Sequence, residues 1–334
     1  MKRARSIFVL TTALAVVAFS RLAGAQDAAP PRLGFPVDCV LGETCFIQSY
    51  VDRDAGPGAV DFACGFRTYD AHDGTDFALP DLAAMMRGVA VVAAAPGRVV
   101  GVRDDMADIS IREAGAPDIK GRECGNRVAI MHGNGWITQY CHMRNGSIAV
   151  KSGQDVKAGE RLGLIGLSGE TEFPHLHFRV ARGDVVVDPF DARTQTASCS
   201  RDVTGNGLWS RAMPYAAGGI ATAGFAAEQP QRAKANEGAY NASSLARAAF
   251  LSFWVEAYGV REGDVNRLTV TGPDGTVTLR GGTTPSSRTQ ARQFHAIGRA
   301  APPAGWPAGS YRGEYQLVRD GKVIAQTVRD ATIP

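Results

Sequence analysis

The sequence predicts a mainly β protein with two β-rich regions. From Phe35 to about Ser200, short runs of β-favouring residues alternate with Gly-rich turns, a spacing that is typical of an all-β barrel or sandwich. Residues 245–334 show a second β pattern, which contains no cysteine and has turn signals such as the one at 272–275. We therefore expect an N-terminal β-barrel or sandwich followed by a smaller C-terminal β-sandwich.

The N-terminus has the layout of a secretory signal peptide. A basic start at residues 2–5 precedes a mostly apolar run at residues 7–19 and a small-residue cleavage site at residues 23–25. The apolar run is shorter than the roughly 20 residues that a membrane-spanning helix needs. We predict that residues 1–25 are a signal peptide, with an uncleaved anchor as the alternative.

Removal of this segment changes the charge of the chain. The segment holds four basic residues (Lys2, Arg3, Arg5 and Arg21) and no acidic one, so the formal net charge falls from +3 to 3 − 4 = −1. A nearly neutral protein lacks the basic surface that nucleic-acid binding requires. The sequence thus predicts an exported protein, periplasmic or extracellular, with no nucleic-acid partner and no membrane span after signal cleavage.

The cysteines agree with export. There are six, and none is part of a C-x-x-C pair, so disulfides are expected rather than a cysteine zinc site: Cys39, Cys45, Cys64, Cys124, Cys141 and Cys199. One pairing is indicated, because the Asn-Gly turn at 134–135 predicts a hairpin whose two ends carry Cys124 and Cys141. The register is imperfect, so this bridge requires a bulge or a longer loop.

The expected domain boundaries follow composition. After the signal peptide, residues 32–200 form the first domain, and the Gly- and Ala-rich residues 201–240 are expected to be a linker. Residues 241–334 form the accessory β-sandwich, which we expect to bind an envelope component, such as a protein partner, or to contact the cleft of the first domain.

The histidines are concentrated in the first domain. Five of the six lie between residues 72 and 177, and His72 is followed by Gly74 and Asp76. His175 and His177, two apart in a predicted strand, would project from one face with Cα atoms roughly 6.6 Å apart. By the same alternation, Tyr140 and His142 would share a face, and Cys141 would point the opposite way.

Two His and one Asp are sufficient to hold a catalytic zinc. Such a site uses three protein ligands and keeps one position for water, whose pKa the metal lowers to about 7. A further His can take the proton, and another can stabilise the oxyanion.

The motifs His72-x-Gly74-x-Asp76, Tyr140-x-His142 and His175-x-His177 resemble those of the lysostaphin/LytM-type zinc metallopeptidases. The resemblance covers about residues 68–190. It implies the duplicated hybrid motif β fold, with zinc as the cofactor and peptide cross-links of bacterial peptidoglycan, formed by its stem peptides, as the substrate.

Carried over residue by residue, the resemblance implies that His72, Asp76 and His177 ligate zinc. His175 would then be the general base or proton shuttle, and His142 would orient water or stabilise the oxyanion. Which of His142 and His175 is the base stays open.

One departure from the family lies before the last motif, where Ser-Thr-Gly is frequent. This chain has GETEFP at residues 169–174, so Glu170, Glu172 and Phe173 are expected to line a rim of the cleft.

The expected function is a zinc-dependent endopeptidase that cleaves peptidoglycan cross-links, with metal-bound water as the nucleophile and a histidine as general base. A lipoyl- or biotin-type carrier is disfavoured, because Lys151 and Lys157 lack the usual Met or Asp neighbours. The remaining alternative is a non-catalytic envelope-binding or hydrolase-activator protein, which we would expect to lack at least one of His72, Asp76 and His177.

Overall fold

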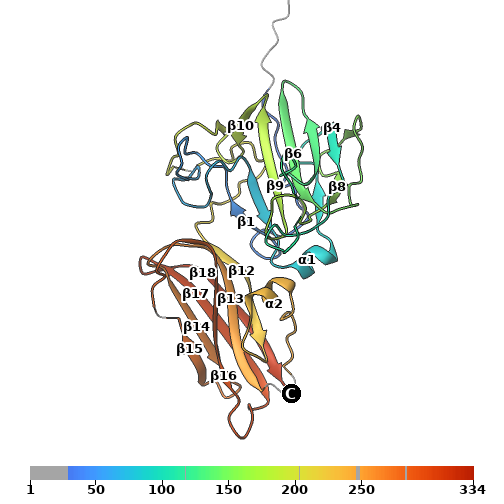
Figure 1. The fold of residues 1–334 in the computed structure, drawn as a ribbon. Coiled ribbons are helices and arrows are strands. Elements are labelled where there is room, and N and C mark those ends of the chain that lie inside the picture. Colours follow the sequence, from blue (N-terminus) through green and yellow to red (C-terminus); the bar gives the residue numbers. More distant parts are fainter. Residues whose placement is uncertain (1–28, 117, 203, 246–248, 283) are drawn as a thin grey trace, which may run out of the picture.

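Two β-rich bodies are stacked end to end in the computed structural model (Figure 1). It describes residues 29–334 except 117, 203, 246–248 and 283, so the predicted signal peptide lies outside the described residues. The described residues form eighteen strands and two short helices, which confirms a mainly β protein with additional C-terminal sheets. Each body has its own large hydrophobic core. Within the described residues, no helix has the length and apolar character needed to cross a membrane.

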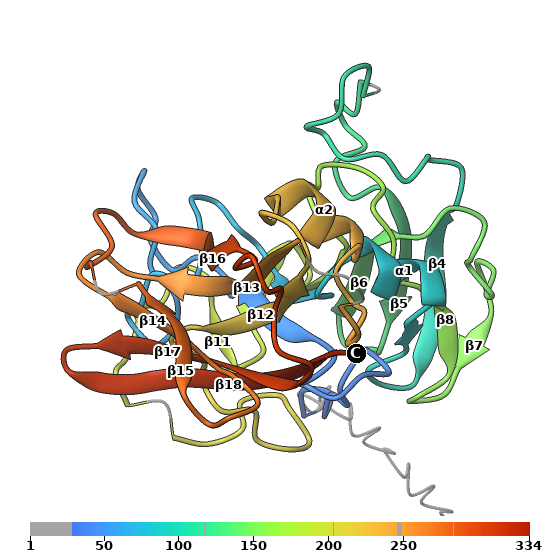
Figure 2. The same cartoon turned by 90° about the horizontal axis from the view of Figure 1, so that it is seen from below.

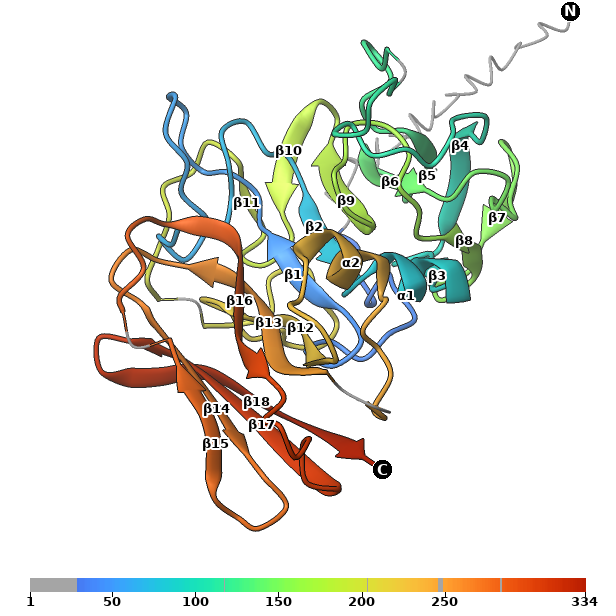
Figure 3. The ribbon, with the colours of Figure 1, turned by 60° about the horizontal axis from the view of Figure 1, so that its bottom comes forward.

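The N-terminal body is built around one large antiparallel sheet with the order β1-β2-β9-β6-β5-β4-β7, in which β10 also pairs with β9, and β11 with β10 (Figure 3). A separate pair, β3 and β8, and the short helix α1 complete this body. The elements are β1 (Phe46–Ser49), β2 (Thr75–Ala78), α1 (Leu82–Arg87), β3 (Ala90–Val92), β4 (Gly97–Arg103), β5 (Asn126–Met131), β6 (Trp136–Met143), β7 (Asp155–Val156), β8 (Arg161–Leu164), β9 (His175–Arg182), β10 (Val185–Asp188) and β11 (Arg193–Thr194).

The central strand β9 shows why this sheet forms. Leu176, Phe178 and Val180 alternate along it and are buried in the core, and Phe178 packs on Tyr140 of β6 with ring centroids 5.2 Å apart. The residues between them face the other side of the sheet. A strand that alternates in this way places polar groups on one face while the opposite face fills the core.

The predicted hairpin and its disulfide are confirmed. Strands β5 and β6 pair around the turn at 133–135, where Asn134 has a φ of 47°, and Cys124 is bonded to Cys141. The other bridges are Cys39–Cys45 and Cys64–Cys199, and no cysteine is free. Three disulfides are typical of exported proteins.

The C-terminal body is a sandwich of two antiparallel sheets, seen as two layers in Figure 2. One sheet has the order β12-β13-β16 and the other β15-β14-β17-β18, and Phe253 of the first packs in the same core as Leu268 and Tyr315 of the second. The elements are β12 (Gly219–Ala226), α2 (Arg232–Glu237), β13 (Phe250–Val260), β14 (Val265–Thr271), β15 (Val277–Gly281), β16 (Gln290–Ala300), β17 (Gly309–Arg319) and β18 (Lys322–Ile333).

The structure differs from the sequence prediction within residues 201–240. This segment was expected to be a linker, but it contains helix α2 and strand β12, which pairs along β13. The small residues that resembled a linker have a packing role, because a Cβ on Gly219 would lie 2.3 Å from the Tyr258 hydroxyl and one on Gly224 would lie 3.2 Å from Trp254. Large aromatic side chains of β13 therefore cover the glycines of β12.

The two bodies meet through specific contacts. Phe46 of β1 stacks on Tyr258 of β13 with ring centroids 4.6 Å apart. Asp81, which caps the N-terminus of α1, accepts a hydrogen bond from Asn241 at 3.0 Å. Helices α1 and α2 face each other at this junction (Figure 1).

Candidate metal centre and active site

Three predicted metal ligands come together on the polar face of the large sheet. Asp76 on β2 lies directly opposite His177 on β9 in the strand register, and His72 lies in the turn that precedes β2. Asp76 Oδ1 is 3.1 Å from His72 Nε2 and 3.0 Å from His177 Nδ1, and the two nitrogens are 3.1 Å apart. All three donor atoms fit within 4.8 Å of one another.

The outward nitrogen of each ligand histidine is held by an oxygen. His72 Nδ1 lies 2.6 Å from the Tyr50 carbonyl, and His177 Nε2 lies 3.1 Å from Asp73 Oδ1. A hydrogen bond donated from one ring nitrogen leaves the lone pair of the other facing the site. Asp73 also forms an ion pair with Arg179 at 2.8 Å.

Asp73 is a site residue that the sequence prediction missed. It occupies the variable position of the His72-x-Gly74 motif, and its only signal was a carboxylate beside a candidate ligand.

Burial alone would lower the pKa of His177, but hydrogen bonds and charge from Asp73 and Asp76 outweigh that effect and raise the pKa to about 9. In the metal-free protein this imidazole therefore holds a proton at neutral pH.

Gly74 is required by the close approach of His177. A Cβ at position 74 would lie 2.5 Å from His177 Nε2 and 2.9 Å from the carbonyl oxygen of Phe178. The glycine between His72 and Asp76 thus lets the imidazole pack directly on the backbone.

His142 reaches the site by a different route from the one predicted. Tyr140 points into the core, where its hydroxyl accepts a hydrogen bond from the Ala94 amide at 2.8 Å, and Cys141 lies opposite His177 on the site face. A register irregularity between β5 and β6 and a φ of 58° at His142 mark a bulge that turns this side chain to the site. The expectation that Tyr140 and His142 share a face was therefore wrong.

His142 and His175 lie beside the three candidate ligands. Their ring centroids are 4.7 Å apart, and that of His142 is 5.9 Å from that of His177. His142 Nδ1 is 2.8 Å from the Ser168 carbonyl, and His175 Nδ1 is 2.9 Å from the Phe173 carbonyl. Because a carbonyl only accepts, both Nδ1 atoms carry the hydrogen and both Nε2 atoms are acceptors in the neutral rings.

Burial keeps these two rings neutral. It lowers the pKa of His142 well below its usual value, with a further contribution from the neighbouring His175 and His177. It also lowers the pKa of His175, although the charge of Asp76 opposes the shift. Two neutral imidazoles, each with its lone pair on Nε2, therefore lie beside the candidate metal site.

Comparison with known proteins agrees with this geometry. The profile of Peptidase family M23 matches residues 70–189, which include the three candidate ligands, Asp73, His142 and His175. Residues 70–189 belong to this family.

The M23 region also aligns with curated proteins. It is similar to two peptidoglycan DD-endopeptidases of Vibrio cholerae. ShyA is 36% identical over 34% of this chain, and ShyB is 34% identical over 36% of this chain. The aligned segments cover 21% and 23% of those proteins, so the chain spans less than a quarter of the length of these relatives. A solved zinc containing peptidase from Vibrio cholerae aligns at 26% identity over 50% of this chain and 39% of that chain, with a TM-score of only 0.32.

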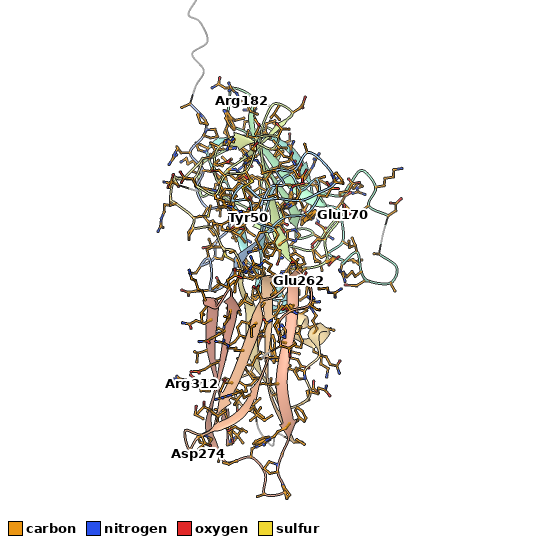
Figure 4. The ribbon with its side chains drawn as sticks, turned by 90° about the vertical axis from the view of Figure 1, so that its left-hand side faces the viewer. Tyr50, Glu170, Arg182, Glu262, Asp274 and Arg312 are labelled. Atoms are coloured by element: carbon orange, nitrogen blue, oxygen red, sulfur yellow. A yellow bond between two sulfur atoms is a disulfide. The ribbon has the colours of Figure 1, made fainter. Side chains whose placement is uncertain are left out.

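The three candidate ligands, His142 and His175 line a cleft of about 820 Å³. Glu170, Glu172 and Phe173 line it, as the departure at residues 169–174 predicted. Figure 4 shows Glu170 on the side of the N-terminal body, close to the end that meets the C-terminal sandwich. Tyr69, which the sequence prediction did not single out, also lines the cleft and packs on His72 with ring centroids 4.4 Å apart.

The donor set fits a zinc ion. Two imidazole nitrogens and one carboxylate oxygen are the donors that zinc uses in catalytic sites. Burial raises the pKa of Asp76, but the surrounding histidines outweigh this and hold the pKa well below its usual value, so the carboxylate is ionised. The Tyr50 carbonyl at His72 Nδ1 and the Asp73 carboxylate at His177 Nε2 are the kind of hydrogen-bond partners that histidine ligands of metals have.

Proposed function

We propose that the protein is a zinc-dependent endopeptidase that hydrolyses peptide cross-links of bacterial peptidoglycan. The observation that carries the proposal is the meeting of five side chains in one cleft. Three supply donor atoms within 4.8 Å of one another, and two are neutral imidazoles that donate from Nδ1 to carbonyl oxygens and therefore keep an acceptor at Nε2. The similarity to proteins named peptidoglycan DD-endopeptidases supports this substrate class.

His72, Asp76 and His177 would hold the zinc, through Nε2, Oδ1 and Nδ1. When bound, zinc supplies Lewis acidity, which polarises a carbonyl and lowers the pKa of a water ligand to about 7. Tyr50 and Asp73 orient the two imidazoles through their outward nitrogens.

His175 and His142 have distinct tasks in this proposal. His175 Nε2 lies 3.5 Å from Asp76 Oδ1, so it borders the metal ligands and accepts the proton of the attacking water as general base. His142 donates its Nδ1 hydrogen to Ser168, so its neutral ring offers only an acceptor at Nε2 and orients the water. Stabilising an oxyanion would require His142 to be protonated, which burial opposes.

The proposed location is the periplasm or the extracellular space. Three disulfides support this location, because such bonds form and persist in oxidising compartments. Peptidoglycan lies in the same compartment, so enzyme and substrate would meet after export.

Digestion of purified peptidoglycan, followed by mass spectrometry of the fragments, tests the proposal. We expect new fragments with free amino and carboxyl ends, their loss with a chelator and their return with added zinc. Intact peptidoglycan under all conditions would contradict the enzyme and favour a non-catalytic envelope-binding or activator protein.

Two variants test the assigned roles against each other. His177→Ala should lose zinc and activity together, whereas His175→Ala should keep zinc and lower turnover by about 100-fold or more. Full zinc content in His177→Ala would refute the ligand assignment, and normal turnover in His175→Ala would refute the proton-transfer role.

A further inference from the structure

The loop residue Phe173 holds His175 in two ways. Its carbonyl oxygen lies 2.9 Å from His175 Nδ1, and its ring centroid lies 4.9 Å from that of the imidazole. Thr171 Oγ1 completes this support, at 2.8 Å from the Phe173 carbonyl oxygen and 3.1 Å from His175 Nδ1. Phe173 and Thr171 therefore help to fix the orientation of this imidazole.

The ring of Phe173 is also contacted by the C-terminal sandwich. The guanidinium carbon of Arg292, on β16, lies 4.0 Å from the Phe173 ring centroid and 5.2 Å from that of Phe46 on β1. Arg292 Nε donates to Gln48 Oε1 at 2.9 Å, and Gln48 Nε2 donates to the Ala291 carbonyl at 3.3 Å. Gln48 and Ala291 both line the active-site cleft.

The guanidinium is poorly satisfied by hydrogen bonds in this position. Its buried Nη2 has no hydrogen-bond partner among the described residues. Glu256 and Glu172 are the acidic groups whose charges act on it, and Arg232 is a nearby cation. A cation with an incomplete set of hydrogen bonds interacts strongly with the face of an aromatic ring where both groups are shielded from water.

We propose that Arg292 is a positioning residue of the active site, which clamps Phe173 against His175 from the C-terminal sandwich. The accessory body thereby becomes part of the catalytic unit, since one of its strands supports the general base and borders the cleft. The expected loss of kcat rests on the proposed function. The expected displacement of the His175 ring does not depend on that function.

A contact that only held the two bodies together would have a different effect when lost. Its loss would lower the stability of the protein without changing the position of the His175 ring. Loss of positioning moves the base relative to the attacked bond, which lowers kcat more than it changes KM, because small displacements of a catalytic group are costly.

The test compares full-length Arg292→Ala and Arg292→Lys with Arg299→Ala. Arg299 is a matched control, because it lies on the same strand and covers the ring of Trp306 at 5.2 Å, away from the cleft. The first readout is the ring-nitrogen NMR spectrum of His175 in ¹⁵N-histidine-labelled, metal-free protein. The second is kcat and KM for a cross-linked muropeptide with zinc bound.

We expect Arg292→Ala to shift or broaden the His175 signals and to lower kcat about 10-fold at unchanged zinc content. Arg292→Lys, which keeps the cation, should recover part of the loss, and Arg299→Ala should match the wild type. An unchanged His175 spectrum together with wild-type kcat in Arg292→Ala would overturn the proposal.

The two proposals fail in distinguishable ways. If the wild-type protein cleaves no muropeptide, the proposed function fails, and the NMR comparison still decides whether Arg292 positions His175. If Arg292→Ala does not fold, Phe173→Leu removes the aromatic face instead and must shift the same signals. An unshifted spectrum in that variant would contradict the clamp.

Discussion

Replacement of Asp73 by Asn tests the negative charge of the partner that orients His177. Asparagine keeps an acceptor oxygen 3.1 Å from Nε2 but removes the negative charge. Mutation of such a partner of a ligand histidine costs about 10- to 100-fold in metal affinity. Because the Asp73 side chain is 43% exposed, water screens its charge, and we expect the lower end, about 10-fold or 1.4 kcal/mol.

Zinc affinity should be measured by competition with a chromophoric chelator at pH 9. At neutral pH the effect is partly masked, because Asp73 also strengthens the hold of His177 on its competing proton. Asp70→Asn is the matched control, since Asp70 lines the same cleft but makes no hydrogen bond to a ligand histidine among the described contacts. Equal affinities for wild type and Asp73→Asn at pH 9 would refute the reasoning.

Three further perturbations follow from the site and its scaffold. Gly74→Ala should displace the His177 ring and destabilise the metal-free protein by about 1–3 kcal/mol in urea, because its Cβ would lie 2.5 Å from Nε2. Gly101→Ala, whose Cβ would have its nearest contact at 3.8 Å, is the control, and equal midpoints would contradict the clash. Zinc affinity of the metal-free protein should rise up to about tenfold per pH unit between pH 6.5 and 9, since His177, with its pKa raised to about 9, must lose a proton on binding. Calorimetry in buffers of different ionisation enthalpy measures that proton, and pH-independent binding would contradict its release. Replacing Cys124 and Cys141 by Ser should lower the free energy of unfolding by about 3 kcal/mol, because the bridge closes a separation of 17 residues, and an unchanged denaturation midpoint would show that it constrains little.

The parts of the site that follow regular β geometry could be predicted from the sequence. His175 and His177 project from one face because they are two apart in a strand, and Asp76 meets His177 across a regular strand pair. The hairpin that carries the Cys124–Cys141 bridge was readable from its Asn-Gly turn.

The parts that depend on local irregularity or on distant contacts could not be predicted. His142 reaches the site only through a bulge, and simple alternation therefore assigned Tyr140 to the wrong face. The partnership of Asp73 with His177 needs the final register of β2 against β9. The contact of Arg292 with Phe173 joins residues more than a hundred positions apart, and nothing in either local sequence indicates it.

The bridge between Cys64 and Cys199 encloses every side chain of the proposed metal site and its two neighbouring histidines, over a separation of 135 residues. A single backbone cut by an envelope protease anywhere inside this covalent ring leaves both fragments attached to each other. In denaturing electrophoresis the cleaved molecule would migrate as one species until a reductant was added. Proteolysis of an exposed loop would therefore not separate the fragments that carry the site.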